Sequence, residues 1–264
     1  MKKACVFVLL LFWSVIATAE ESTTWNKDST PTKIRMCWHE GAPYSASDLL
    51  DGGLEADFTS TVMIEAGFEP EVIFVPWARC KLGAQKGLYD MLFAMWQDVD
   101  LHQQYFDFFH TTDIQLTSFV VLEESPLQSG ELKDMNGVRV ALHNHGGYSS
   151  DLLNHEGFEF YYVNYSVQKV KMLARGRVDV IIGDPSRLEH DRNTNLLDHD
   201  IKLRVLQPPI QVQRTGPAIA KTNPHGKEII RRYNEAYLRL CENGVLQDII
   251  YKHGFDFEPV DCPR

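Results

Sequence analysis

The sequence lacks the features that would place the chain on a nucleic acid or across a membrane. The apolar run at residues 4–16 is shorter than a membrane-spanning helix requires. Lys and Arg number 26 against 36 Asp and Glu, which gives a net charge of -10. This balance disfavours nucleic acids and anionic membrane surfaces as partners. We expect a small or basic partner instead.

The motifs of several common enzyme classes are missing as well. There is no Gly-x-Ser-x-Gly, no His-Glu-x-x-His, no phosphate-cradling loop and no dinucleotide fingerprint. Ser166 and Lys169 have the Ser-x-x-Lys spacing of penicillin-recognising enzymes, but a serine that caps a helix produces the same letters. We therefore expect a protein that is not an enzyme and needs no cofactor.

The apolar run fits the pattern of a secretory signal peptide. Two lysines precede it, and the small-residue segment 17–19 follows it. Cys5 lies inside the run and not directly after a cleavage site, so a lipoprotein anchor is not favoured. The sequence predicts a signal peptide at 1–19, a flexible segment at 20–32 and a soluble chain exported to the periplasm.

Four cysteines remain after the signal peptide: Cys37, Cys80, Cys241 and Cys262. An even number in an exported chain is typical of disulfides, and four cysteines allow three connectivities. We favour Cys37–Cys80, which joins the first predicted strand to the helix after the second, and Cys241–Cys262, which fixes the C-terminal tail. A metal site is not expected, because no paired short spacing such as Cys-x-x-Cys is present.

Strand and helix patterns alternate in two successive series. The first series predicts a strand, a helix, a strand, a helix and a strand at 33–38, 54–68, 69–77, 78–87 and 89–95. The second series repeats this order at 137–143, 148–157, 158–163, 166–176 and 178–183. Such alternation is typical of α/β folds with parallel strands, and two series predict two sheets.

Each series closes with the same element, a glycine followed three residues later by an aspartate and then by an apolar strand. The pairs are Gly87–Asp90 and Gly176–Asp179. Each glycine follows a predicted helix end, where a left-handed backbone costs glycine little. After a short extended segment at 215–221, the last third predicts helices through 227–244 and 245–255, which must pack on a lobe already built.

From residue 33 to 255 the chain resembles the extracellular solute-binding proteins of family 3, the periplasmic receptors that deliver polar amino acids to ABC importers. The order of motifs carries the resemblance: "APY" at 42–44, "GLEADFTSTVMIEAGF" at 53–68, "PWARCKLGAQKGLYD" at 76–90, "YFDFFHTTD" at 105–113, "LKDMNGVRVALH" at 132–143, "GRVDVIIGD" at 176–184 and the helical segment 216–255. The "PWARC" form with a partner cysteine at 37 resembles a divergent, cysteine-bearing branch.

The resemblance implies a two-lobed periplasmic-binding-protein-like α/β fold, in which each lobe is a mostly parallel sheet flanked by helices and two crossing segments form the hinge. Lobe 1 would comprise 33–117 and 217–264, and lobe 2 would comprise 118–216. The implied function is capture of a small polar, amino-acid-like or amine-bearing ligand in the cleft, with an ABC permease as a possible partner. A monomer is implied. The alternatives are an orphan or signalling receptor, or a periplasmic dehydratase-type enzyme on the same fold.

The charged candidates are Asp184, His102 and Arg79. By resemblance Asp184 matches the carboxylate that holds a ligand's amino group, although an aspartate here also suits a helix N-cap. His102 stands where the family has an arginine that grips a carboxylate through two hydrogen bonds, and histidine cannot form that fork. Arg79 could supply the missing charge, or could lie on a solvated helix face.

The aromatic candidates are Tyr44, Trp77 and Trp96, which fall at or just after predicted strand ends. Flat rings at these positions would enclose a ligand and attract a cation. Core packing or surface scatter would explain the tryptophans equally well.

The segment "HNHGGYSSD" at 143–151 adds Tyr148 and Ser149 to the candidate ligand-binding residues. Backbone N–H groups at a helix start favour anions, so this segment could accept an anionic end of the ligand, or a serine could simply cap its own helix. His143 and His145 alternate on a strand end without a carboxylate or cysteine in register, so a metal site is not expected.

Overall fold

The computed structural model describes residues 32–144, 148–195 and 201–263. Its first group of elements comprises β1 (Thr32–Trp38), η1 (Leu50–Gly52), α1 (Leu54–Glu65), β2 (Phe68–Phe74), α2 (Trp77–Gln85), β3 (Met91–Trp96), α3 (Asp100–Tyr105) and β4 (Phe106–Phe108). The chain returns to this group at its end through α7 (Gly226–Glu242) and α8 (Val245–Lys252). Helix α1 packs against both returning helices, as the two long amphipathic patterns predict.

The second group of elements comprises η2 (Leu132–Asp134), β6 (Val138–His143), α4 (Ser150–Leu153), β7 (Phe158–Val163), α5 (Ser166–Ala174), β8 (Val180–Gly183), α6 (Pro185–Asn195) and β9 (Leu203–Val205). Its apolar core has two parts, one around Phe119, Val140 and Ile182 and the other around Val120, Ala141 and Ile181. Neighbouring residues thus point to opposite faces of the central strands, and both faces are buried, as expected for parallel strands covered by helices.

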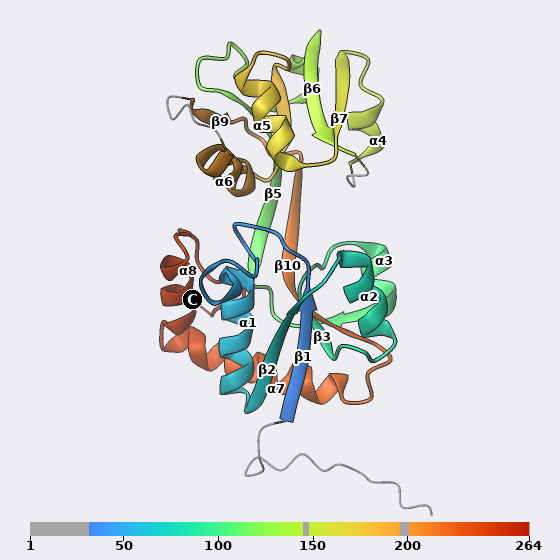
Figure 1. Ribbon diagram of the computed structural model, residues 1–264, viewed down its shortest axis with the longest axis vertical. Helices are drawn as coiled ribbons and strands as arrows, with labels where there is room; N and C mark the ends of the chain where they lie inside the picture. The colour runs from blue at the N-terminus through green and yellow to red at the C-terminus, as the bar shows by residue number, and fades with distance from the viewer. Residues whose placement is uncertain (1–31, 145–147, 196–200, 264) are drawn as a thin grey trace, which may run out of the picture. The chain divides into compact units, whose positions relative to one another are not determined.

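Two long strands, β5 (Asp113–Leu122) and β10 (Gln211–Ala220), join the groups. The strand order is β2-β1-β3-β10-β5-β8-β6-β7, with β4 paired to β10 and β9 paired to β5. Residues 113–117 of β5 pair with β10, whereas residues 118–122 pair with β8 and β9. Figure 1 shows β5 and β10 side by side between the elements around β1–β3 and those around β6–β8.

The two groups share one parallel pattern, and this confirms the predicted fold class. Strand β1 pairs in parallel with β2 and β3, and β6 pairs in parallel with β7 and β8. The pairings made by β5 and β10 are antiparallel. The described residues therefore form a mixed α/β structure with a parallel sheet in each half and an antiparallel crossing.

The repeated Gly-x-x-Asp element makes the same contact twice. Asp90 accepts hydrogen bonds from the backbone N (2.8 Å) and the guanidinium of Arg35 on β1. Asp179 accepts the equivalent bonds from the backbone N (2.9 Å) and the guanidinium of Arg139 on β6. Gly87 and Gly176 have φ of 74° and 63°, which confirms the predicted left-handed backbone. In each half, the aspartate therefore links the start of the last parallel strand, β3 or β8, to the first, β1 or β6.

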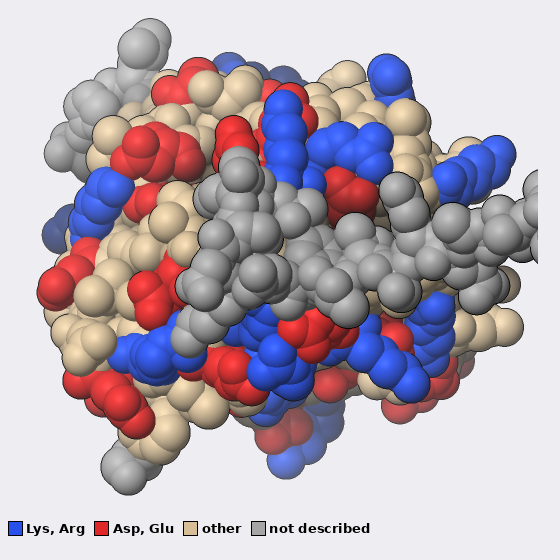
Figure 2. Space-filling model, turned by 90° about the horizontal axis from the view of Figure 1, so that it is seen from below, with Lys and Arg blue, Asp and Glu red and all other residues tan. Residues whose placement is uncertain are grey.

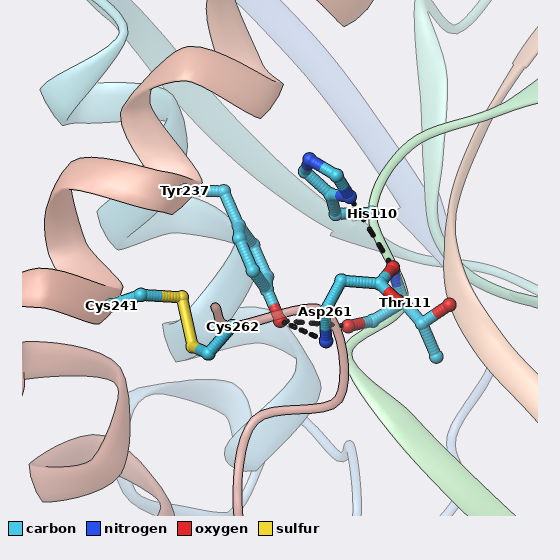
Figure 3. The surroundings of a disulfide bond; sticks show 6 residues. All are labelled: His110, Thr111, Tyr237, Cys241, Asp261 and Cys262. Atoms are coloured by element: carbon cyan, nitrogen blue, oxygen red, sulfur yellow. Dashed lines mark hydrogen bonds and ion pairs between the residues drawn. A yellow bond between two sulfur atoms is a disulfide. The ribbon is translucent and has the colours of Figure 1, made fainter. Parts of the chain in front are cut away.

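Both expected disulfides are present, Cys37–Cys80 and Cys241–Cys262. The second ties the C-terminal tail to Cys241 on α7 (Figure 3). Asp261, next to Cys262, accepts hydrogen bonds of 2.7 Å from Thr111 N and from Arg214 Nη2 on β10. The hydroxyl of Tyr237 donates to the Thr111 carbonyl and accepts from Asp261 N. The tail therefore contacts the segments that lead into both crossing strands.

Three elements differ from the sequence-based expectations. Helix α4 spans Ser150–Leu153 and not the predicted 148–157, and the chain after it turns through hydrogen bonds from His155 N to the Leu152 carbonyl and from Phe158 N to the His155 carbonyl. Strand β10 begins at Gln211, earlier than the predicted 215. Its first five residues are mostly polar, so they lack the apolar pattern that would predict a strand. Helix α6 buries only Leu188, so its sequence carries little apolar periodicity.

Charges on the described surface are mixed, and none of the helices searched could cross a membrane. Figure 2 shows basic and acidic side chains interspersed on the face seen from below. Within residues 32–144, 148–195 and 201–263, no helix has both the length and the apolar character that a membrane span needs.

Candidate functional site

A cleft of about 870 Å³ opens at the carboxyl ends of four parallel strands. Trp38 ends β1, Trp96 ends β3, His143 ends β6 and Gly183 ends β8, and all four line the cleft. Residues on both crossing strands complete the lining. The carboxyl ends of parallel strands are where open α/β sheets bind their ligands, so this cleft is the candidate site.

Tyr44 and Asp184 meet in this cleft from opposite halves of the structure. The Tyr44 hydroxyl donates to Asp184 Oδ1 at 2.9 Å, and Arg187 N donates to the same oxygen at 2.8 Å. Asp184 therefore lines the cleft and also makes the backbone contact of a helix N-cap for α6. Burial raises the pKa of Asp184, while the two hydrogen bonds and the Arg187 charge oppose that rise.

The loop that carries Tyr44 is fixed by close packing. Phe255 stacks on the Tyr44 ring with centroids 5.2 Å apart. Gly53 has φ of 90°, and a Cβ there would lie 2.6 Å from the Tyr44 carbonyl oxygen. Glu55 N donates to that same carbonyl. The start of α1 can therefore approach the loop only because residue 53 is glycine.

Arg187 is a cleft residue that the sequence did not single out. Its Nη2 donates to the Gly41 carbonyl at 3.0 Å, so α6 also contacts the loop after β1. The guanidinium lowers the pKa of nearby His39, although burial is the larger cause of that decrease. Arg187 is thus a cation at the Asp184 side of the cleft.

Aromatic rings form one wall of the cleft. Trp38 and Trp77 meet edge to face with centroids 4.9 Å apart, and Trp77 meets His102 in the same manner at 5.9 Å. Lys81 Nζ lies 5.5 Å from the centroid of the Trp77 ring. Such rings offer apolar area and a face that attracts cations.

His102 lies in the cleft but presents little charge. Its Nδ1 is 2.9 Å from the Trp96 carbonyl oxygen, and burial lowers the pKa of its imidazole below the ordinary value. At neutral pH the ring is therefore largely uncharged. It does not offer the forked cationic contact of the arginine that the family resemblance implies at this position.

The crossing strands present a row of uncharged polar groups to the cleft. Three pairs face each other across the antiparallel ladder: Gln211 with Thr117, Gln213 with Gln115, and Thr215 with Asp113. All except Asp113 line the cleft. Successive lining residues are two apart on each strand, as required for side chains on one face. The Trp96 indole donates to Gln115 Oε1 at 3.0 Å and joins this row to the aromatic wall.

Glu55, on α1, is the most deeply buried carboxyl group that lines the cleft. It is 2% exposed, and burial raises its pKa to about 8, an increase to which the Asp113 charge also contributes. Burial likewise raises the pKa of Asp113 to about 6. Glu55 therefore carries a proton at neutral pH in the unliganded cleft.

The sequence-predicted ligand residues divide into two sets. Six line the cleft: Tyr44, Trp77, Trp96, His102, Tyr148 and Asp184. Arg79 is exposed on α2 and does not line it, and Ser149 caps α4 by accepting a hydrogen bond from Leu152 N. The roles of all eight in ligand binding stay predictions.

Several cleft residues escaped the sequence interpretation. Trp38 ends the first strand as Trp96 ends the third, and that parallel could have identified it. Glu55, Gln213 and Thr215 gave no such signal, because a glutamate in an amphipathic helix and polar letters in a strand usually face solvent.

The histidines considered as metal ligands give no site in the described residues. His143 lines the cleft, whereas His145 lies outside the residues that the structure describes. No group of three or more His, Cys, Asp or Glu in the described ranges is arranged to hold a metal ion.

Comparisons with known proteins place the fold. No protein-family model matches the sequence, and no curated protein matches it. A histidine kinase sensor domain with similarity to periplasmic binding proteins has a TM-score of 0.69 at 19% identity, over 87% of this chain and 99% of that chain. The unliganded, open L-cystine solute receptor of Neisseria gonorrhoeae has a TM-score of 0.65 at 17% identity, over 84% and 92%.

A third similar structure is an amino acid ABC transporter substrate-binding protein of Streptococcus pneumoniae bound to L-arginine. Its TM-score is 0.63 at 17% identity, over 84% of this chain and 94% of that chain. At these identities the likeness concerns architecture, and this chain has the two-lobed α/β fold of periplasmic binding proteins.

Proposed function

We propose that the chain is an exported solute-binding protein that captures a small amine-bearing solute in the cleft between its lobes. The contact between Tyr44 and Asp184 carries the proposal, because it brings a half-buried carboxylate and a hydroxyl from opposite halves to one point. The two described donors to Asp184, the Tyr44 hydroxyl and Arg187 N, both donate to Oδ1. The other oxygen, Oδ2, would then accept from an ammonium group. The rings of Trp38, Trp77 and Trp96 would enclose the body of the solute.

The hinge of this binding protein would be the pair of crossing strands. We place lobe 1 at 33–117 and 217–264 and lobe 2 at 118–216, because β5 exchanges its pairing partner between Thr117 and Ser118. Rotation there would open the cleft by parting Tyr44 from Asp184. A bound solute favours the closed state only by its higher affinity for that state.

Delivery to an ABC permease is the biological role that we propose first, with the chain acting as a monomer in the periplasm. Structures of similar fold include amino acid ABC transporter substrate-binding proteins. A signalling role is the second candidate, because a histidine kinase sensor domain also has this fold. Docking of the loaded protein to a permease or to a sensor protein would distinguish the two.

A thermal-shift screen of amines, amino acids, peptides and small acids tests the proposed function, followed by calorimetry on each stabilising compound. Asp184→Asn should weaken binding of a stabilising amine at least tenfold, since the variant loses the charge that faces the ammonium. Asp151→Asn removes an exposed carboxylate that does not line the cleft and should bind as the parent does.

Two outcomes would contradict the proposal. The first is that no amine stabilises the protein, and the second is that Asp184→Asn binds the amine as tightly as the parent does. Conversion of a bound acid into a new product would favour the dehydratase-type alternative.

A further inference from the structure

Glu55 lies in the cleft without a cationic hydrogen-bond partner. Its Oε2 accepts from Ser45 Oγ at 3.1 Å, and its Oε1 accepts from Gln115 Nε2 at 3.3 Å. Both donors are uncharged. A carboxyl group this deeply buried is costly to ionise unless a cation lies beside it.

The charges around Glu55 come from three elements and are mainly negative. Asp113 at the start of β5 and Asp184 before α6 both disfavour its ionisation, whereas Arg187 on α6 favours it. Arg187 also faces Asp184 and donates to the Gly41 carbonyl. Among the described groups that act on Glu55, the Arg187 guanidinium is thus the one cation, while Lys169 acts together with Arg187 on Asp184.

Two buried polar side chains of β10, in the lining of the same cleft, each have an oxygen without a hydrogen-bond partner among the described residues. Gln213 is 6% exposed and Thr215 is 2% exposed, and both line the cleft. Gln213 Oε1 and Thr215 Oγ1 have no hydrogen-bond partner among the described residues. Gln213 faces Gln115 across the ladder, and Gln115 in turn donates to Glu55. Buried polar atoms are normally satisfied, so this region is built to receive N–H or O–H donors.

We infer that Glu55, with Gln213 and Thr215, forms a second cation subsite, so that the solute carries two separate cationic N–H groups. This inference rests on the proposed function, in which Asp184 holds the first group. Diamines and basic amino acids are the two sources of this chemistry. A quaternary ammonium does not fit, because it cannot donate to the unpartnered oxygens.

Binding at this subsite exchanges a proton for a cation. In the unliganded cleft Glu55 holds its proton, because burial raises its pKa to about 8. The second ammonium or guanidinium of the solute would favour the carboxylate, and the proton would pass to the buffer. Proton release that Glu55→Gln abolishes is therefore a signature of binding at this subsite.

Matched ligand pairs test the inference. L-Lysine and L-norleucine differ by a terminal ammonium group, as do cadaverine and pentylamine. Calorimetry with the parent protein should show that at least one dication binds tenfold or more tightly than its matched monocation. Glu55→Gln keeps the shape and the uncharged contacts, and it should reduce that ratio to near one. Asp151→Asn, at an exposed carboxylate outside the cleft, should keep the ratio.

Proton release gives a second readout that needs no variant. Titration of the parent at pH 7 in phosphate and in Tris should give different apparent enthalpies, corresponding to release of up to one proton per dication bound. Glu55→Gln should abolish that difference.

The possible failures are distinguishable. If monocations bind as tightly as their dications and Asp184→Asn abolishes their binding, the second subsite is wrong and the proposed function stands. If dications bind tightly without proton release, the second subsite is also wrong. If no amine binds at all, both proposals are wrong.

Discussion

Glu55 and Asp113 are acids whose pKa values are raised by burial, to about 8 and about 6. Between the ordinary glutamate value of 4.5 and about 8, the folded protein holds a proton on Glu55 that the unfolded chain has lost. A state that binds more protons loses stability as the pH rises. Glu55 therefore destabilises the unliganded protein increasingly across this range.

The expected outcome is a melting temperature that falls from pH 7 to pH 8, since Glu55 alone contributes up to about 1.4 kcal/mol per pH unit. Glu55→Gln should remove the part of this pH dependence that comes from Glu55. Calorimetric melts of the parent and the variant at both pH values measure the difference. If the parent and the variant show the same pH dependence between pH 7 and pH 8, Glu55 is not a buried carboxyl group without a cationic partner.

The sequence predicted some residues of the candidate site and missed others. Asp184 and Tyr44 could be named as candidate ligand residues because each follows a recognisable strand or motif. Glu55 was not found, because its burial depends on Gln115 and Ser45, which lie on other segments. No local pattern records such a contact.

At the scale of strands and helices, one aspartate–arginine contact occurs in both lobes, and we call it the Asp–Arg lock. Asp90 holds Arg35 between β3 and β1, and Asp179 holds Arg139 between β8 and β6. Each aspartate accepts three hydrogen bonds, including one from backbone N. The same three-residue spacing after a glycine thus gives the same tertiary contact in both lobes.

Asp179→Asn should lower the free energy of unfolding by about 1 kcal/mol, because it weakens charged hydrogen bonds that are partly exposed to solvent. Asp90→Asn should have a similar effect. Denaturant melts of both variants and of Asp134→Asn, an exposed carboxylate outside the lock, measure the difference. Equal stability in all three would show that the lock contributes nothing.

The C-terminal disulfide is a second stabilising element. Replacing both Cys241 and Cys262 by Ser should lower the free energy of unfolding by roughly 3 kcal/mol, given that the bond spans 21 residues. Asp261 would then hold Thr111 (Figure 3) and Arg214 less firmly. Calorimetry of the double variant tests this. An unchanged melting temperature would mean that noncovalent contacts alone fix the tail.

At the scale of the whole molecule, the residue pattern predicted the two parallel series and the returning helices, whereas the two crossing segments were implied by the family resemblance alone. Strand β5 alternates polar and apolar residues over 113–117, so its pattern alone could have predicted a strand whose Gln115 and Thr117 line the cleft. Strand β10 has a weaker pattern, because Gln211, Gln213, Arg214 and Thr215 are all polar. In β10, the polar residues that line the cleft therefore weaken the pattern that would predict a strand.

The most direct test of the central claim is a crystal structure of the protein with an amine taken from the thermal-shift screen. We expect the solute in the cleft, with a nitrogen about 3 Å from an Asp184 carboxylate oxygen and its body against Trp77 or Trp96. A saturating amine found on another surface, with the cleft empty, would contradict the account.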